Sequence, residues 1–150
     1  MGKVIIGADH RGYKLKDKII EMLRESGYTV TDIGAKKYDP DDDYIDFAVK
    51  VAEEVSLQNI KGIIICRSGI GVSIAANKVD GIRAGLCTTL KQTRLARTDD
   101  DINILCLSAE LVSEEKNFKI VKKFLETVFS SDERYINRII KIKKYEVEKC

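Results

Sequence analysis

The sequence predicts an α/β fold in three layers: a doubly wound, Rossmann-like parallel sheet of five strands, helices on both of its faces, and one extra helix at the C-terminus. Two observations lead to this prediction. Short β-branched runs alternate with segments of helical periodicity along the whole chain, as in right-handed βαβ units. The 150 residues, 44% of them hydrophobic, include no linker long enough to separate a second domain. Residues 1–150 are therefore expected to form a single domain.

The first half of the chain is expected to supply three strands and two helices. The strands cover residues 4–6, 28–33 and 62–66, and the last of these is apolar throughout, as a central strand buried on both faces would be. Gly27 ends the first helix. Apolar residues recur at a period near 3.6 on each helix: Leu15, Ile19, Met22 and Leu23 on the first, and Tyr44, Phe47, Ala48, Val51, Ala52 and Val55 on the second.

The second half repeats this pattern with shorter elements. Strands are expected over residues 83–87 and 102–107, and helices over residues 73–78 and 90–97. A long helix follows Ser113, and its apolar positions are Phe118, Val121, Leu125 and Val128. Residues 132–150 form one more amphipathic helix with no further strand to cover. It packs either on another subunit or across its own domain.

Composition excludes several classes of protein. The chain has no N-terminal apolar leader and no apolar run near the roughly 20 residues that span a bilayer, so we expect a cytoplasmic protein without membrane contact. Cys66, Cys87, Cys106 and Cys150 are widely spaced, which indicates reduced thiols. One histidine and no Cys-x-x-Cys pair predict no metal site and no cofactor. A net charge of +2 without a binding motif argues against nucleic acid.

Two loops at the carboxyl ends of strands, where open parallel sheets bind ligands, contain the candidate chemistry. Residues 66–73 read CRSGIGVS, and their backbone N–H groups at a helix start can surround a negatively charged oxygen. That helix start and cations such as Arg67 or His10 favour a Cys66 thiolate able to accept a proton. The same motif alone also fits a dinucleotide or phosphate loop with an inert cysteine.

The second loop, residues 7–12, reads GADHRG and holds the only histidine. His10 follows a strand directly, so we expect it to face a ligand. Asp9 is expected to fix its tautomer, and Arg11 adds positive charge.

These loops resemble the family of type B ribose-5-phosphate isomerases and galactose-6-phosphate isomerases. The matching segments are GADHRGYKLK from residue 7 and CRSGIGVSIAANK from residue 66, and the resemblance extends over nearly the whole chain. It implies isomerisation of a sugar phosphate without metal, most simply ribose 5-phosphate to ribulose 5-phosphate, through a cis-enediolate. It also implies homodimers or dimers of dimers whose sites are built from two chains, which places residues 132–150 at the dimer interface.

The resemblance implies a role for each matching residue. Cys66 matches the base, and Ser68 keeps the hydroxyl of the usual threonine. The amides of residues 68–72, which include Gly69, Ile70 and Gly71, would stabilise the enediolate oxygen. The residues that match substrate-binding positions are His10, Arg134 and Arg138 for the phosphate, and Asp9 and Tyr44 for the sugar.

Three positions depart from the family pattern and make the site more negative. Asp99 and Asp100 stand where His-Asn, the ring-opening acid and its neighbour, is common, and Glu110 stands where arginine is usual. Anionic substrate is then bound less well unless an arginine compensates. The arginines that can compensate are Arg94, Arg97 and Arg67, and Arg67 is also expected to bind the substrate. Asp99 can still donate a proton beside Asp100, because neighbouring carboxylates favour the protonated form; spontaneous ring opening is the other route.

Other functions fit the same residues. The chain could be the B-type subunit of a heteromeric galactose-6-phosphate isomerase that needs a paralogous subunit, or an isomerase of another sugar phosphate. It could also be a catalytically impaired protein that only binds a sugar phosphate. A receiver or dinucleotide-binding domain fits poorly, because no complete Gly-x-Gly-x-x-Gly follows the first strand.

Overall fold

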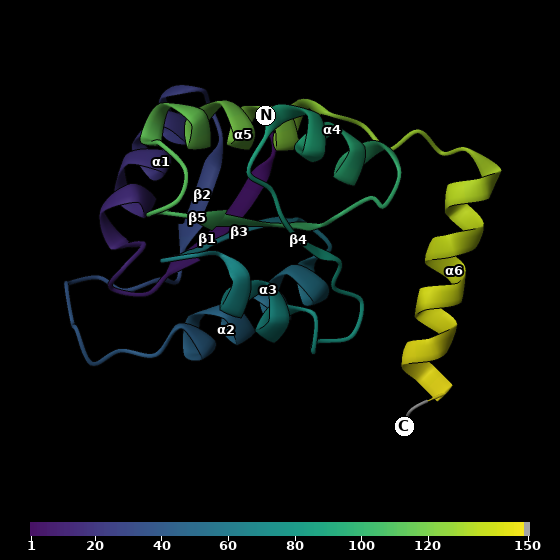
Figure 1. Cartoon of the computed structure of the whole chain (residues 1–150), viewed down its shortest axis with the longest axis horizontal. Helices are drawn as coiled ribbons and strands as arrows, with labels where there is room; N and C mark the ends of the chain where they lie inside the picture. Colours follow the sequence, from purple (N-terminus) through teal and green to yellow (C-terminus); the bar gives the residue numbers. More distant parts are fainter. Residues whose placement is uncertain (149–150) are drawn as a thin grey trace.

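The computed structural model describes residues 1–148, and these form a three-layer α/β sandwich followed by a separate helix (Figure 1). All neighbouring strands pair in parallel, in the order β2-β1-β3-β5-β4. The predicted five-stranded sheet is therefore confirmed, with β3 at its centre. The strands are β1 (Lys3–Ala8), β2 (Thr29–Asp32), β3 (Lys61–Cys66), β4 (Ala84–Leu86) and β5 (Ile104–Ser108).

Helices cover both faces of the sheet, as Figure 1 shows. They are α1 (Tyr13–Glu25), α2 (Tyr44–Gln58), α3 (Ile70–Ala76), α4 (Leu90–Thr98), α5 (Glu114–Glu126) and α6 (Glu133–Glu148). Side chains alternate along β3, because Ile63 and Ile65 join the core under α1 and α5. Ile64 and Cys66 join the core under α2 and α3. The face that carries Cys66 is thus the one that α3 covers.

Two predicted helix boundaries are wrong. The short third helix begins at Ile70, three residues before the expected residue 73, because Gly69 adopts the left-handed conformation (φ 79°) and turns the chain directly after β3. The fifth helix ends at Glu126, since Thr127 is extended (ψ 126°). Val128, expected on the apolar face of that helix, lies beyond it and is 79% exposed.

The C-terminal helix α6 stands apart from the sandwich (Figure 1). Ile139 is its one buried residue, while Ile136, Ile140 and Ile142 are exposed. Near its far end, the Glu146 carboxylate accepts a hydrogen bond from the Gly81 N–H at 3.2 Å. The helix therefore does not cover the sheet of its own chain. The expected helix extended to residue 150, and its last two residues, 149 and 150, lie outside the described residues.

Cys66, Cys87 and Cys106 are free and buried, and Cys150 lies outside the described residues. Among the helices of residues 1–148, none is both long enough and apolar enough to pass through a bilayer.

Candidate active site

Three segments meet at the carboxyl end of β1 and β3. Ala8 and Ile65 are register partners, so the loop after β1 lies beside the loop after β3. The contacts are close: a Cβ atom at Gly12 would lie 2.6 Å from the Ile65 carbonyl oxygen, and one at Gly71 would lie 2.6 Å from the Tyr44 ring. The structure therefore brings together the predicted residues of the first two loops and the start of α2: Asp9, His10, Tyr44, Cys66, Arg67, Ser68, Gly69, Ile70 and Gly71.

Cys66 ends the central strand and is only 5% exposed. Its Sγ atom accepts a hydrogen bond from the Gly69 N–H at 3.1 Å. The left-handed conformation of Gly69 allows this tight return of the chain toward the sulfur. The sulfur that the sequence predicts as the proton acceptor is thus fixed by the turn that follows it.

Ser68 is half-buried two residues after Cys66, and its hydroxyl oxygen accepts a hydrogen bond from the Ile70 N–H at 3.3 Å. The hydroxyl can donate to a ligand at the same time, because it has one O–H donor and two lone pairs. A thiol and a hydroxyl thus lie on the same turn, at the start of α3.

The loop after β5 fixes this turn from the other side. The Ala109 N–H donates to the Cys66 carbonyl oxygen at 3.0 Å, and the Ser108 hydroxyl donates to the Arg67 carbonyl oxygen at 2.8 Å. The Glu110 N–H also donates to the Arg67 carbonyl, at 3.1 Å. These bonds hold the backbone of the predicted base in place before any ligand arrives.

Arg67 forms a two-point ion pair with Glu110. Its Nη2 atom lies 3.0 Å from Oε1, and Nε contacts Oε2. Both side chains are largely exposed, and the hydrogen bond from Arg67 lowers the pKa of the Glu110 carboxyl. Arg67 was one of the arginines expected to offset the added negative charge, and it contacts Glu110 directly. Arg97 is the wrong candidate, because it is buried at the opposite end of the sheet on Asp101.

Asp42, which the sequence did not single out, holds His10. One oxygen of Asp42 accepts hydrogen bonds from His10 Nδ1 at 2.6 Å and from the His10 backbone N–H at 3.0 Å. The expectation that Asp9 fixes the tautomer is wrong. With Nδ1 engaged, Nε2 is the ring nitrogen left for a ligand. The acidic run before Tyr44 was the one sequence feature that pointed to Asp42, and Asp42 lies 32 residues after His10.

Asp9 instead shapes its own loop. Its Oδ1 atom accepts hydrogen bonds from the N–H groups of Arg11 and Gly12, both at 3.0 Å. Burial raises the pKa of Asp9, although these donors and the neighbouring His10 oppose the shift. Among the described residues, Asp9, His10 and Asp42 have ligand atoms within 4.8 Å of one another, close enough to hold a metal ion. The hydrogen bonds between His10 and Asp42 already account for much of this proximity.

Four predicted residues do not reach the site within one chain. Asp99 and Asp100 precede β5 at the amino edge of the sheet, whereas Cys66 pairs in register with Ser108 at the carboxyl end of that strand. Arg134 and Arg138 are exposed on α6, and the Arg138 guanidinium lies 5.6 Å from the centre of the Tyr135 ring. One chain therefore brings Cys66 and His10 to the same end of the sheet, and leaves Asp99, Asp100, Arg134 and Arg138 away from them.

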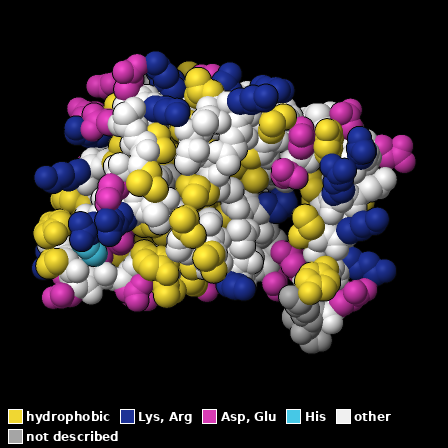
Figure 2. Space-filling view, in the orientation of Figure 1, with side chains coloured by type: hydrophobic (Ala, Val, Ile, Leu, Met, Phe, Trp, Pro, Cys, Tyr) yellow, Lys and Arg dark blue, Asp and Glu magenta, His cyan; other side chains and the backbone are white. Residues whose placement is uncertain are grey.

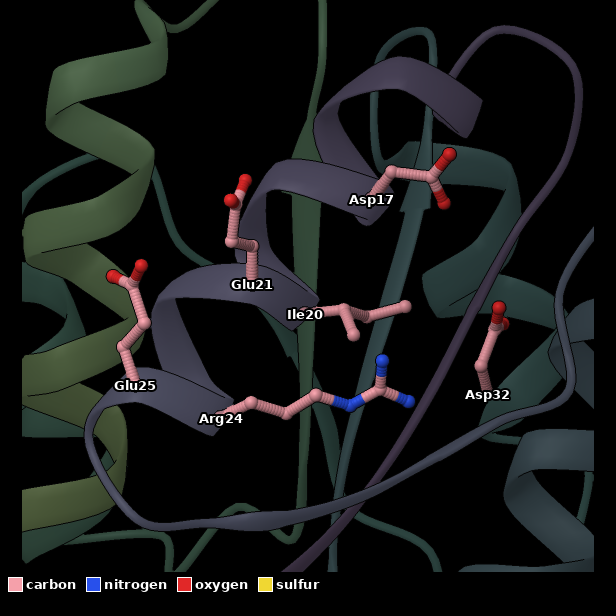
Figure 3. A pocket seen from close by; sticks show the side chains of 6 residues that line it. All are labelled: Asp17, Ile20, Glu21, Arg24, Glu25 and Asp32. Atoms are coloured by element: carbon pink, nitrogen blue, oxygen red, sulfur yellow. The ribbon is translucent and has the colours of Figure 1, made fainter.

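A hollow of about 360 Å³ beside α1 lies away from this site (Figure 3). Its lining residues are Asp17, Ile20, Glu21, Arg24, Glu25 and Asp32. None of them belongs to the predicted site. Asp32 is already engaged, because it binds the buried Lys16 ammonium at 2.7 Å, and its contacts with Lys16 and Lys36 lower its pKa in spite of burial.

The chain matches known proteins over nearly its whole length. It is 44% identical over 147 residues to a probable ribose-5-phosphate isomerase B of Mycoplasma genitalium, covering 97% of this chain and 96% of the relative. It is 37% identical over 145 residues to ribose-5-phosphate isomerase B of Mycobacterium tuberculosis, covering 96% and 90%.

Solved structures agree. Ribose-5-phosphate isomerase B from Mycoplasma genitalium with bound ribulose-5-phosphate superposes with a TM-score of 0.94 at 42% identity, covering 98% of this chain and 97% of that one. The corresponding enzyme of Clostridium thermocellum gives 0.95 at 41% identity, covering 99% of both chains. The family profile described as Ribose/Galactose Isomerase matches residues 4–142. The chain therefore belongs to the ribose/galactose isomerase family.

Proposed function

We propose that this chain interconverts ribose 5-phosphate and ribulose 5-phosphate. The observation that supports the proposal most strongly is the buried Cys66 sulfur at the end of the central strand, hydrogen-bonded to the Gly69 N–H. The likeness to an isomerase structure that holds ribulose-5-phosphate supports the choice of sugar.

In the proposed reaction, the Cys66 thiolate takes the proton from C2 of the open-chain aldose. This gives a cis-enediolate, whose oxygens the N–H groups of residues 68–72 stabilise; one such preorganised donor typically contributes roughly 3 kcal/mol to lowering the barrier. The Ser68 hydroxyl carries the O2 proton to O1, and Cys66 returns its proton to C1, which yields the ketose. No electron donor or acceptor outside the sugar is needed.

We propose that the substrate is held by residues of two copies of the chain. Asp9 and Tyr44 contact the sugar, His10 contacts the phosphate, and Arg67 adds positive charge. The second copy supplies Arg134 and Arg138 for the phosphate, with Asp99 as the ring-opening acid and Asp100 beside it.

The exposed apolar residues of α6 support a second copy as its partner. An amphipathic helix that stands apart from its own sandwich leaves an apolar surface in water, and such surfaces mark protein interfaces. Further exposed apolar side chains lie on α3 and α4: Ile70, Ile74, Leu90 and Leu95. We therefore propose that residues 1–150 act as one domain within a cytoplasmic homodimer or dimer of dimers, with residues 132–150 at the interface.

The purified chain alone, incubated with ribose 5-phosphate, tests the proposed function. We expect ribulose 5-phosphate to form. If the folded chain binds ribose 5-phosphate without turnover, the proposal is wrong and a binding role takes its place. If turnover requires a paralogous chain and favours galactose 6-phosphate, the subunit alternative is correct.

Asp42 is expected to act as a positioning residue for His10. Because its carboxylate holds both the ring and the backbone N–H of His10, Asp42→Ala should raise the KM for ribose 5-phosphate about tenfold with little change in kcat. Asp42→Asn keeps an acceptor oxygen and should recover part of the loss. Asp41→Ala, on the exposed neighbouring residue, is the matched control.

A double-mutant cycle separates this role from a general structural one. In a His10→Ala background, Asp42→Ala should no longer change the KM, because the residue through which it acts is absent. An equal loss in both backgrounds would contradict the assignment.

A further inference from the structure

A second cleft, of about 430 Å³, opens at the end of the sheet opposite Cys66. The same strand connects the two places, since β3 begins at Lys61 in the cleft and ends at Cys66, about 17 Å away at 3.3 Å per residue. Lys143 of α6 lines one side, and Figure 2 shows the molecule hollowed between the sandwich and α6. The volume lies within the range of small-molecule sites.

Positive charge predominates in this cleft. Four of the lining residues are basic and one is acidic: Lys61, Arg83, Arg97, Lys143 and Asp101. The single carboxylate is shared, because Arg83 and Arg97 both bind Asp101, at 3.1 and 2.7 Å. At the rim, Glu146 accepts the Gly81 N–H at 3.2 Å. Among residues 1–148, the lining of the cleft therefore contains more cations than carboxylates.

Lys61 is a half-buried cation of this cleft whose printed hydrogen bonds go to carbonyl oxygens and not to a carboxylate. Its ammonium donates to the carbonyl oxygens of Leu125 at 3.0 Å and Phe124 at 3.4 Å, and no carboxylate of residues 1–148 lies within ion-pair distance of it. Burial and the nearby Arg97 cation lower the pKa of Lys61 to about 8, while Asp101 opposes this shift. A half-buried ammonium is therefore held among like charges, an unfavourable arrangement that an anion in the cleft would relieve.

We propose that this cleft binds a small dianion, either inorganic phosphate or the phosphate group of an organic monoester, at a site separate from the isomerase site. Lys61 of β3 and Lys143 of α6 line the cleft from two different elements and would contact the anion. The Nε atom and one Nη atom of both Arg83 and Arg97 already donate to Asp101 or to backbone carbonyls, which holds the two guanidinium groups in place. The other Nη atom of each would donate to phosphate oxygens. The residues involved play no part in the proposed proton transfer.

Sulfate and glycerol 2-phosphate, titrated at constant ionic strength into the ¹⁵N-labelled full chain, distinguish this site from the isomerase site. The amide signals of Gly81, Arg83 and Asn103 report on the cleft, and those of Gly69 and Gly71 report on the opposite end. We expect the cleft signals to shift saturably with both anions. Tighter binding of glycerol 2-phosphate than of sulfate would identify an organic monoester as the ligand, and equal binding would identify the free anion.

Lys61→Met keeps most of the apolar stem and removes the buried charge, so the variant should fold. The affinity measured at the cleft signals should fall at least about tenfold, the usual effect of losing one charge-assisted hydrogen bond. Lys143→Met, on the exposed helix, should also weaken binding, and Lys122→Met, on the exposed face of α5, should not. The proposal is overturned if only the Gly69 and Gly71 signals respond, or if Lys61→Met binds sulfate as the unchanged chain does.

Discussion

Replacing Cys66 with alanine is expected to lower kcat for ribose 5-phosphate by roughly 10²–10⁴-fold, the usual contribution of one general base. The thiol is the one candidate base on the turn at the start of α3, because Ser68 beside it stays protonated at neutral pH. The Gly69 N–H would lose its sulfur acceptor but can bind water or substrate in its place. Circular dichroism and steady-state kinetics on the same preparation measure fold and activity together.

Cys87→Ala is the matched control. Cys87 is also buried but lies after β4, away from the turn at the start of α3, and burial raises the pKa of its thiol. We expect this variant to lose some stability and to keep kcat. Wild-type turnover by Cys66→Ala, beyond trace contamination, would show that another group takes the proton.

Gly69→Ala is expected to have the second-largest effect, through both backbone and contacts. The left-handed conformation (φ 79°) costs an L-residue roughly 1–2 kcal/mol, and the added Cβ would lie 2.5 Å from the Leu86 side chain and 3.1 Å from the Leu107 backbone. The turn must then move, which withdraws the N–H from the Cys66 sulfur. We expect a lower midpoint of urea unfolding and at least a roughly tenfold loss in kcat/KM.

Gly81→Ala separates the two causes. Gly81 has nearly the same φ of 80°, but its added Cβ would meet only the Ser56 hydroxyl oxygen at 3.4 Å. This variant should lose the conformational part of the stability and keep its activity. Equal losses in the two variants would mean that the collision at Gly69 does not matter.

The fold could be predicted because local signals and burial agree. Every strand except β4 contains β-branched residues, and the continuous apolar run at β3 proved to be the central strand, buried on both faces. The boundaries at Ile70 and Glu126 were missed because they depend on single backbone conformations, at Gly69 and Thr127, that do not alter hydrophobic periodicity.

The site could be predicted only where its residues follow strands. Asp9, His10 and Cys66 sit at strand ends, which parallel pairing brings together. Asp42 was missed because it lies 32 residues after His10 in the sequence, in the loop between β2 and α2 that returns to this histidine. Asp9 was the nearer carboxylate in sequence. No local pattern encodes such a return.

One of the three departures from the family pattern has a partner close by. Glu110 replaces the usual arginine, and its negative charge is paired with Arg67 of the loop after β3. Asp99 has a partner of its own chain, since its carboxylate accepts the Thr98 hydroxyl at 2.6 Å. Asp99→Asn keeps an acceptor oxygen for Thr98, so the activity of this variant would test the proposed role of Asp99 in ring opening with little change in the folded chain.

We propose that the isomerase site combines Cys66 of one copy of the chain with Arg134 and Arg138 of another. The most direct test mixes two inactive variants, Cys66→Ala and the double variant Arg134→Ala with Arg138→Ala, unfolds them together and refolds them. If random pairing gives half mixed dimers, each with one intact site, about one quarter of wild-type turnover should return. A mixture no more active than the sum of its parents would contradict a shared site.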